Sequence, residues 1–198
     1  MKTFYIIASI GFLFLMIQSY KLLSNNLKTE NQKYRLVLKD AQFEIRFYPS
    51  ATFAKIYSSG TDYKSVSSSG FRKLAGYIFG GNDQGKSISM TAPVRMEMSD
   101  KGSSMSFVMP EKYKEADLPK PKDASVQIVK SSPQYVAVIS FGGYADDESI
   151  QENRNLLLKL IQKKGIKVTG EYSFLGYNAP FQFWGRKNEV VIPIEWKE

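Results

Sequence analysis

Two short stretches combine cationic side chains with apolar or aromatic neighbours, and they hold the clearest binding chemistry in the chain. Arg72 follows Phe71 in the run FRKLAGYIF, and Arg186 and Lys187 follow the aromatic run APFQFW. An apolar surface with cations at its rim suits an apolar molecule that carries carboxylates. The candidate ligand-binding residues are Phe71, Arg72, Leu74, Ala75, Ile78, Phe181, Phe183, Trp184, Arg186 and Lys187.

Each of these residues also has a plain structural interpretation. Leu74 and Ile78 fit the buried face of a helix, and core packing is the favoured interpretation for both. Phe181 and Trp184 stand in a loop-like segment, where core packing and ligand contact are evenly balanced. Arg186 and Lys187 also fit the simple interpretation of solvated surface charges.

The chain contains no histidine and no cysteine. This composition excludes zinc sites built on those residues, Ser-His and Cys-His nucleophile pairs, iron–sulfur clusters, disulfides and a histidine-ligated haem. General acid–base catalysis would fall to carboxylates, lysine or tyrosine, and no pair of carboxylates has a spacing that commits to it. We therefore expect no enzyme, no catalytic residues and no metal site.

Residues 80–87, GGNDQGKS, satisfy the letters of the nucleotide-binding P-loop, G-x-x-x-x-G-K-[ST]. A working P-loop follows a buried strand and opens a helix whose N-terminus faces the phosphate. Here the motif follows a helical pattern and leads into the strand-like run SISMTAPV. The context predicts a glycine-rich turn between a helix and a strand rather than a nucleotide site.

Four elements recur in the same order along the chain, about 84 residues apart. A strand-like run at 52–58 or 135–141 is followed by a helical pattern, an Ala-Pro dipeptide, and then FVMP or VVIP. Two copies are too few for an open solenoid. We therefore expect two repeats, at about 34–110 and 125–196, that close around a pseudo-two-fold axis and leave a cleft between them.

The spacing of apolar side chains predicts a mixed α+β fold. Helical spacing indicates one helix over residues 65–79 and a second over 148–164, each followed by glycine. Alternation indicates two paired strands around a turn at 39–41. Further strands are expected at 52–58, 88–97, 104–109, 125–129, 136–141, 172–177 and 189–194. The proline-bearing stretch 110–125 is expected to be an exposed connector.

The N-terminus is predicted to lie outside the folded part. Residues 4–17 are almost wholly apolar, and the stretch extended to residue 23 is long enough to span a bilayer. No convincing small-x-small cleavage site follows, so a membrane anchor over residues 1–23 is favoured over a cleaved signal peptide. Residues 24–33 are expected to be a tether. The domain at 34–198 is then exported, and it is either membrane-anchored or secreted or periplasmic.

The formal net charge of the chain is +8 at pH 7. The basic residues are dispersed along the sequence rather than clustered on one stretch. A dispersed charge argues against a nucleic-acid interface. We therefore expect a small molecule and a membrane as partners, no nucleic acid, and an oligomeric state that the sequence leaves open.

Three motifs, GGNDQGKSISMTAPV, VISFGGYADD and APFQFWGRKNEVVIP, occur in this order and spacing. Together they resemble the SOUL haem-binding protein family, and the similarity extends from about Tyr34 to Trp196. The resemblance implies a distorted antiparallel β-barrel built from two pseudo-symmetric β-α-β-β repeats with one main helix each. It also implies non-covalent binding of haem or a related tetrapyrrole, and a relationship to bacterial effector-binding domains.

The sequence departs from the family pattern where the iron and the propionates would be held. The histidine proposed as iron ligand in some members is missing, and Gly76 and Gln182 stand roughly where some relatives place lysines. Other candidates for an iron contact are Tyr77, Tyr177, Met90, Met96 and Met98. We therefore expect weak, reversible binding in an apolar cleft, which suits a carrier or buffer.

Two other interpretations stay open. One is an effector-binding module for another small apolar or cationic molecule, in which Glu97 would be a buried counter-ion; an exposed strand carboxylate is the plainer interpretation. The other is a membrane-tethered interaction domain that binds no small ligand.

Overall fold

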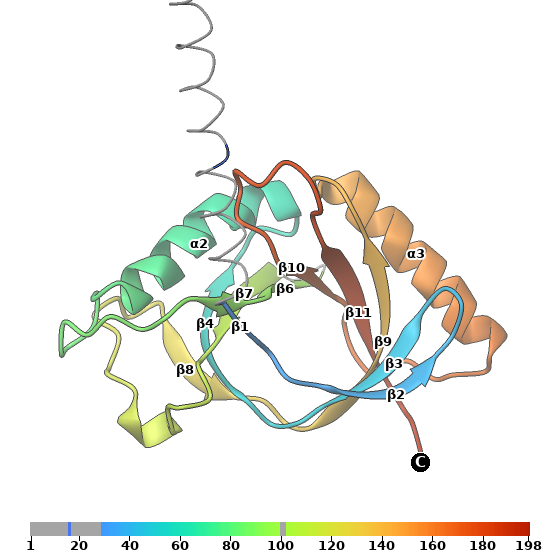
Figure 1. Ribbon diagram of the computed structural model, residues 1–198, viewed down its shortest axis with the longest axis horizontal. Coiled ribbons are helices and arrows are strands. Elements are labelled where there is room, and N and C mark those ends of the chain that lie inside the picture. Colours follow the sequence, from blue (N-terminus) through green and yellow to red (C-terminus); the bar gives the residue numbers. More distant parts are fainter. Residues whose placement is uncertain (1–15, 17–28, 100–101) are drawn as a thin grey trace, which may run out of the picture.

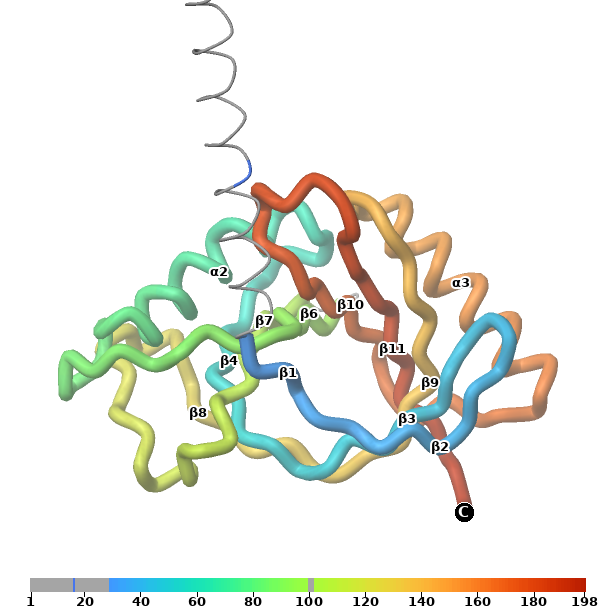
Figure 2. Tube along the Cα trace, viewed as in Figure 1, coloured from blue at the N-terminus to red at the C-terminus, as the bar shows by residue number. Residues whose placement is uncertain are grey.

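The computed structural model describes residue 16, residues 29–99 and residues 102–198. The described chain forms an α+β fold in which one curled antiparallel sheet carries two long helices on its outer face (Figures 1 and 2). Apart from residue 16, the predicted anchor lies outside the described residues, as do residues 24–28 of the predicted tether. The rest of the predicted tether is described, and its residues Glu30–Asn31 form a short strand rather than a free linker. Within the described residues, no helix has both the length and the apolar character needed to cross a membrane.

Within the described residues, fourteen elements follow one another along the chain, and Figure 1 labels those for which there is room. They are β1 (Glu30–Asn31), β2 (Arg35–Lys39), β3 (Glu44–Tyr48), β4 (Thr52–Ser58), α2 (Tyr63–Ile78), β5 (Thr91–Ala92), β6 (Val94–Ser99), β7 (Gly102–Val108), the 3₁₀ turn η1 (Glu115–Asp117), β8 (Gln127–Lys130), β9 (Gln134–Phe141), α3 (Asp147–Lys163), β10 (Ser173–Gly176) and β11 (Asn188–Ile194). Both helices agree with the predicted spans to within two residues.

The main sheet has nine strands in the order β2-β3-β9-β11-β10-β6-β7-β4-β8. All eight of its neighbouring pairs are antiparallel. β1 lies apart from this sheet and pairs in parallel with β5. The predicted strand at 88–97 is divided into β5 and β6, because Pro93 stands between them and has no N–H to offer a ladder.

The elements β4, α2, β6 and β7 follow one another in the same order as β9, α3, β10 and β11. The Ala-Pro dipeptides, however, do not occupy matching places in this order. Ala92-Pro93 directly precedes β6, whereas Ala179-Pro180 lies in the loop after β10. The predicted correspondence between the two dipeptides is therefore wrong. One dipeptide lies before its strand, β6, and the other lies after the corresponding strand, β10.

Each helix begins at an aspartate that caps its first turn. The carboxylate of Asp62 accepts a hydrogen bond from the Ser65 amide at 2.7 Å, and Asp146 forms a reciprocal capping box with Ser149. Such caps satisfy amide groups that have no partner inside the helix. The carboxylate of Asp147 also accepts from the Tyr63 amide at 2.6 Å, so the N-termini of α2 and α3 are joined.

The turn after α2 contains residues 80–87, which match the letters of the P-loop motif but lack its structural context. Residues 80–87 lead to β5 and no helix follows them directly. The buried Asn82 amide donates to the Tyr77 and Lys86 carbonyls, and its oxygen accepts from the Lys86 amide. Gly80 has a φ of 104°, which favours glycine. The prediction of a helix-to-strand turn is confirmed.

The two faces of the curled sheet differ in character. The outer face packs against α2 and α3 and forms the main hydrophobic core, which includes Leu74, Ile78, Leu157 and Ile161 from the helices. The inner face carries a small apolar cluster around Leu175 together with charged side chains on several strands. The sheet therefore offers two separate surfaces on which a ligand could be bound.

Candidate functional site

An apolar cleft of about 610 Å³ opens between α2, the ends of β6, β7 and β10, and the loop after β10. This volume falls in the range usual for small-molecule sites. The residues that line the apolar cleft are Tyr63, Ser67, Ser68, Phe71, Arg72, Ala75, Val94, Met96, Met105, Tyr144, Phe174, Gly176, Asn178, Pro180, Arg186 and Asn188.

The apolar side chains of this cleft are fixed by the packing of α2 on the sheet. Phe71 meets the ring of Phe107 edge-on at 5.4 Å between centroids, and Tyr63 meets Phe174 in the same way at 5.3 Å. At Gly70 an added Cβ would lie 2.9 Å from the end of the Ile56 side chain. The missing side chain therefore lets the helix lie close to β4 and β7, where the side chain of Met105 forms part of the floor.

Two arginines stand among the lining residues. Arg72 is exposed on α2. Arg186 donates from Nη1 to the carbonyls of Ala179 and Gln182 at 2.8 and 2.9 Å, and its guanidinium lies 4.3 Å from the centroid of the Tyr144 ring. The Nε of Arg186 is buried and has no hydrogen-bond partner within the described chain. Arg186 thus stabilises the loop through two hydrogen bonds, and its Nε–H group is the donor without a partner among the described residues.

The structure brings four of the ten candidate residues together: Phe71, Arg72, Ala75 and Arg186 all line the apolar cleft. Leu74 and Ile78 lie in the core under α2 instead, because the helix turns them toward the sheet. Phe181, Phe183 and Trp184 are exposed in the loop between Pro180 and Arg186, and the Trp184 side chain is 85% exposed.

Lys187 also lies away from the apolar cleft. Its ammonium group pairs with Glu189 at 3.0 Å and stands 4.3 Å from the centroid of the Tyr177 ring. Glu189 lies on β11 opposite Leu175 and faces the inner side of the sheet. Arg186 and Lys187 are adjacent in the sequence, yet their side chains lie on opposite faces of the sheet, because successive side chains of an extended segment point in alternate directions.

Several lining residues were not among the candidates from the sequence. Tyr63, Met105 and Tyr144 come from the first turn of α2, from β7 and from the loop after β9. Met105 is an ordinary core residue by its strand pattern, and only the fold places it beneath α2. Tyr144 does lie in the motif VISFGGYADD, and this was the one local signal that could have pointed to it.

Only one of the five suggested iron contacts lines the apolar cleft, namely Met96. The hydroxyl of Tyr77 donates to the Pro119 carbonyl at 3.0 Å on the other side of α2, and burial raises the pKa of Tyr77 to about 12. The hydroxyl of Tyr177 donates to Glu189. The described residues contain no group of three or more Asp or Glu that could hold a metal ion.

The described chain thus combines a curled sheet, two outer helices and, beside α2, a cleft of the size usual for small-molecule sites. The chain belongs to the SOUL family, whose model, described as SOUL heme-binding protein, matches residues 29–193. This match confirms the resemblance that the three sequence motifs carried.

The chain is also similar to proteins named heme-binding protein 1 and heme-binding protein 2. Heme-binding protein 2 of Mus musculus is 32% identical over 159 residues, which cover 76% of this chain and 77% of that protein. The Homo sapiens protein of the same name is also 32% identical over 159 residues, with the same shares of both chains. Heme-binding protein 1 of Xenopus laevis is 28% identical over 172 residues, which cover 81% of this chain and 90% of that one.

Solved structures share the fold at much lower sequence identity. The C-terminal domain of EcmrR matches with a TM-score of 0.62 at 10% identity, over 79% of this chain and 98% of that one. An uncharacterized conserved protein from Listeria innocua matches with a TM-score of 0.59 at 12% identity, over 78% and 92% of the two chains. These similarities establish the fold alone.

Proposed function

We propose that the protein binds haem or a related tetrapyrrole in the apolar cleft, non-covalently and reversibly, as a carrier or buffer. One observation carries the proposal: Phe71, Arg72 and Ala75 of α2 and Arg186 of a distant loop line the same cleft of about 610 Å³. Membership of the SOUL family and the names of the two heme-binding protein relatives support it.

The residues of the apolar cleft suit the chemistry of a tetrapyrrole. A flat apolar plate would be buried against Phe71, Met96 and Met105, and burial of apolar surface would supply most of the affinity. Its two carboxylates would be met by Arg72 and Arg186, because a guanidinium forms charge-assisted hydrogen bonds with carboxylates. The unused Nε of Arg186 is one donor for this purpose.

The chain has no histidine, so the affinity for haem must rest on apolar burial and on the arginines. Haem supplies the iron when it is bound, and Met96 is the suggested iron contact that lines the apolar cleft. Phe181, Phe183 and Trp184 are exposed between two lining residues and would cover the outer edge of the ligand. Weak and exchangeable binding follows from the missing strong ligand.

A titration of the full-length protein with haemin, followed at the Soret band, tests this proposal. We expect a saturable shift at about one equivalent. Ala75→Phe places a ring inside the apolar cleft and should weaken binding about tenfold or more. Ser69→Phe is the matched control, because Ser69 is exposed on the same helix and is not among the residues that line the apolar cleft.

Equal haemin affinities for the Ala75→Phe and Ser69→Phe proteins would place the ligand elsewhere. No saturable Soret shift, beside a working control protein, would remove the tetrapyrrole and leave the effector-binding interpretation. Arg72→Gln should weaken haemin binding severalfold and leave the folding midpoint unchanged, since Arg72 is exposed on α2.

We also propose that the matching order of β4-α2-β6-β7 and β9-α3-β10-β11 reflects two pseudo-symmetric repeats. A further proposal concerns the N-terminal segment: residues 1–23 anchor the protein in a membrane with the domain exported. The apolar composition of residues 4–17 supports this. Carbonate extraction should leave the full-length protein in the membrane pellet, whereas recovery of a shortened soluble chain would favour a cleaved signal peptide.

A further inference from the structure

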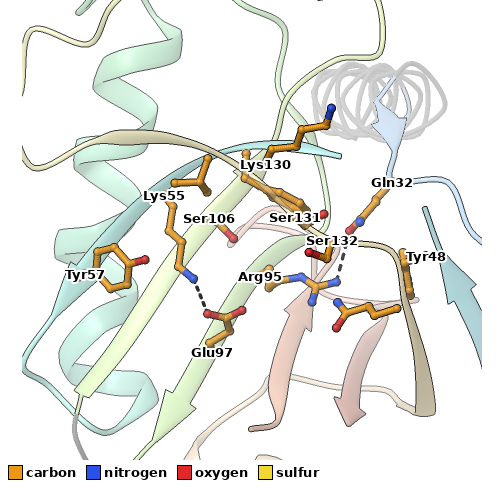
Figure 3. A pocket seen from close by; sticks show the side chains of 13 residues that line it. Gln32, Tyr48, Lys55, Tyr57, Arg95, Glu97, Ser106, Lys130, Ser131 and Ser132 are labelled. Carbon is orange, nitrogen blue, oxygen red and sulfur yellow. Dashed lines mark hydrogen bonds and ion pairs between the residues drawn. The ribbon is translucent and has the colours of Figure 1, made fainter. Parts of the chain in front are cut away.

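A second hollow, the inner cavity, lies on the inner face of the sheet and has a volume of about 350 Å³ (Figure 3). Side chains of β4, β6 and β7 and of the segment that leads from β8 to β9 surround it, and Gln32 covers one side. The inner cavity is separate from the apolar cleft, because successive residues of β6 face opposite sides: Met96 lines the cleft and Arg95 lines the inner cavity.

The strand register places Arg95 at the centre of a row of inner-face residues. Arg95 is directly opposite Ser106 on β7 and Leu175 on β10. Ser106 is in turn opposite Lys55 on β4. Cross-strand neighbours have Cβ atoms about 5 Å apart, so the guanidinium of Arg95 is surrounded by a fixed set of inner-face side chains.

Arg95 is buried, with only 7% of its surface exposed, and its charge has no carboxylate partner within the described chain. Its Nε has no hydrogen-bond partner there, and Nη2 reaches only the side-chain oxygen of Gln32, at 3.5 Å. The guanidinium lies 5.7 and 5.9 Å from the ring centroids of Tyr48 and Phe53. A buried charge without a partner is costly, and an anion held in the inner cavity would offset that cost.

None of the other charged residues around the inner cavity forms an ion pair with Arg95, and the charge of Glu97 acts on it only from a distance. Glu97 is the carboxylate of the same strand, but it pairs with Lys55 at 2.5 Å and accepts a hydrogen bond from Ser104 at 2.9 Å. Burial raises the pKa of Glu97, but the hydrogen bonds from Lys55 and Ser104 and the charges of Lys55 and Arg95 together hold the pKa below its usual value. Lys130 adds a further positive charge at the edge of the inner cavity.

We propose that the inner cavity is a binding site for a small organic carboxylate whose anionic group is held by Arg95. The planar guanidinium fork matches a carboxylate, and the rings of Tyr48 and Phe53 provide an apolar surface for the body of the ligand. Arg95 is the buried cation of this lining that forms no ion pair with a described residue, which suits a monoanion, whereas Lys130 is exposed at the edge. A phosphate dianion is disfavoured because Glu97 also lines the inner cavity.

Isothermal titration of the full-length protein with benzoate tests this site, with benzamide as the neutral molecule of the same shape. We expect one benzoate per chain and at least tenfold weaker binding of benzamide. Arg95→Gln should weaken benzoate binding at least tenfold. Arg35→Gln is the matched control and should bind as the wild type does, because Arg35 is exposed on β2 and pairs with Glu198 at 2.6 Å.

A second variant keeps the test decisive if Arg95→Gln fails to fold. Ser106→Leu fills the inner cavity from the neighbouring strand without removing the charge, and it should also weaken benzoate binding at least tenfold. Benzoate that binds equally to the wild type and to either inner-cavity variant would overturn the site. Benzamide binding as tightly as benzoate, or inorganic phosphate binding in place of benzoate, would overturn the assignment to a carboxylate. None of these outcomes depends on haemin binding.

Discussion

Two buried arginines on the inner face of the same sheet have opposite surroundings. Arg46 on β3 donates to both oxygens of Glu189, at 3.0 and 2.9 Å, and also pairs with Glu44. Arg95 on β6 has no such carboxylate within the described chain. A bidentate pair with further hydrogen bonds is the arrangement in which a buried charge is tolerated. The paired arginine is therefore a structural residue, and the unpaired one is the better candidate for a ligand.

Glu189 is the residue at which loss of one partner should be most costly. Its side chain is 0% exposed, and it also accepts hydrogen bonds from Tyr177 and Ser140. Glu189→Gln should lower the free energy of unfolding by about 3 kcal/mol, because Arg46 would keep its charge without a buried counter-ion. Urea unfolding measures the change. Glu195→Gln, which removes an exposed pair with Lys167, should cost less than about 0.5 kcal/mol.

The same carboxylate should give the protein an acid-sensitive stability. Burial raises the pKa of Glu189, but the hydrogen bonds and charge of Arg46, with the Tyr177 hydrogen bond and the charge of Lys187, together hold the pKa below its usual value. A group whose pKa is lowered by folding stabilises the native state above its unfolded pKa, and this contribution is lost as the pH falls through the folded pKa. The wild type should therefore lose stability more steeply than Glu189→Gln below about pH 4. Parallel pH profiles would contradict this assignment.

Among the elements, α2 matters most for the proposed function, because its first three turns supply Tyr63, Phe71 and Arg72 to the apolar cleft. Its start is fixed by the Asp62 cap, and its closeness to the sheet is permitted by Gly70. Local sequence therefore sets where the helix begins, and one missing side chain sets how closely it packs.

Loss of the cap at Asp62 should weaken the start of α2. Asp62→Ala should lower the free energy of unfolding by about 1 kcal/mol, because the Ser65 amide loses its acceptor. Asp62→Asn keeps an acceptor oxygen at the cap and should retain most of the stability. Urea unfolding of both proteins gives the comparison. If both variants lost stability equally, the role of Asp62 would be one of charge rather than of hydrogen bonding.

At the scale of the whole molecule, one sheet separates two hollows of different chemistry. The apolar cleft lies on the outer side, where α2 packs. The inner cavity lies on the concave side, and Figure 3 shows the side chains that line it. β6 contributes to both through alternate residues, Met96 outward and Arg95 inward. A rigid sheet between the two sites gives no reason for one ligand to change the affinity of the other.

The two sites should therefore bind their ligands independently. Saturation with haemin should change the dissociation constant of benzoate less than twofold, as measured by isothermal titration with and without haemin. A tenfold weaker binding of benzoate in the presence of haemin would show that the two molecules compete for one site or that the sheet couples two sites.

The sequence by itself determined the helices, most strands and the kinds of site that a chain without histidine and cysteine cannot form. Helical spacing with the aspartates Asp62 and Asp146 located both helices, because caps and periodicity act over a few residues. The absence of histidine excluded a histidine-ligated haem in any fold. The motif order was sufficient to indicate the family, which the match over residues 29–193 confirms.

Only the tertiary structure decided which side chains share a surface. Arg186 and Lys187 look alike in sequence, and their separation onto opposite faces became visible only in the fold. Arg95 and Glu189 both look like charges on strands, and whether each has a partner depends on the order and register of strands far apart in the chain. The alternation of side chains in the sequence shows which residues of a strand share a face. It does not identify the neighbouring strand, because pairing is fixed by contacts between distant segments.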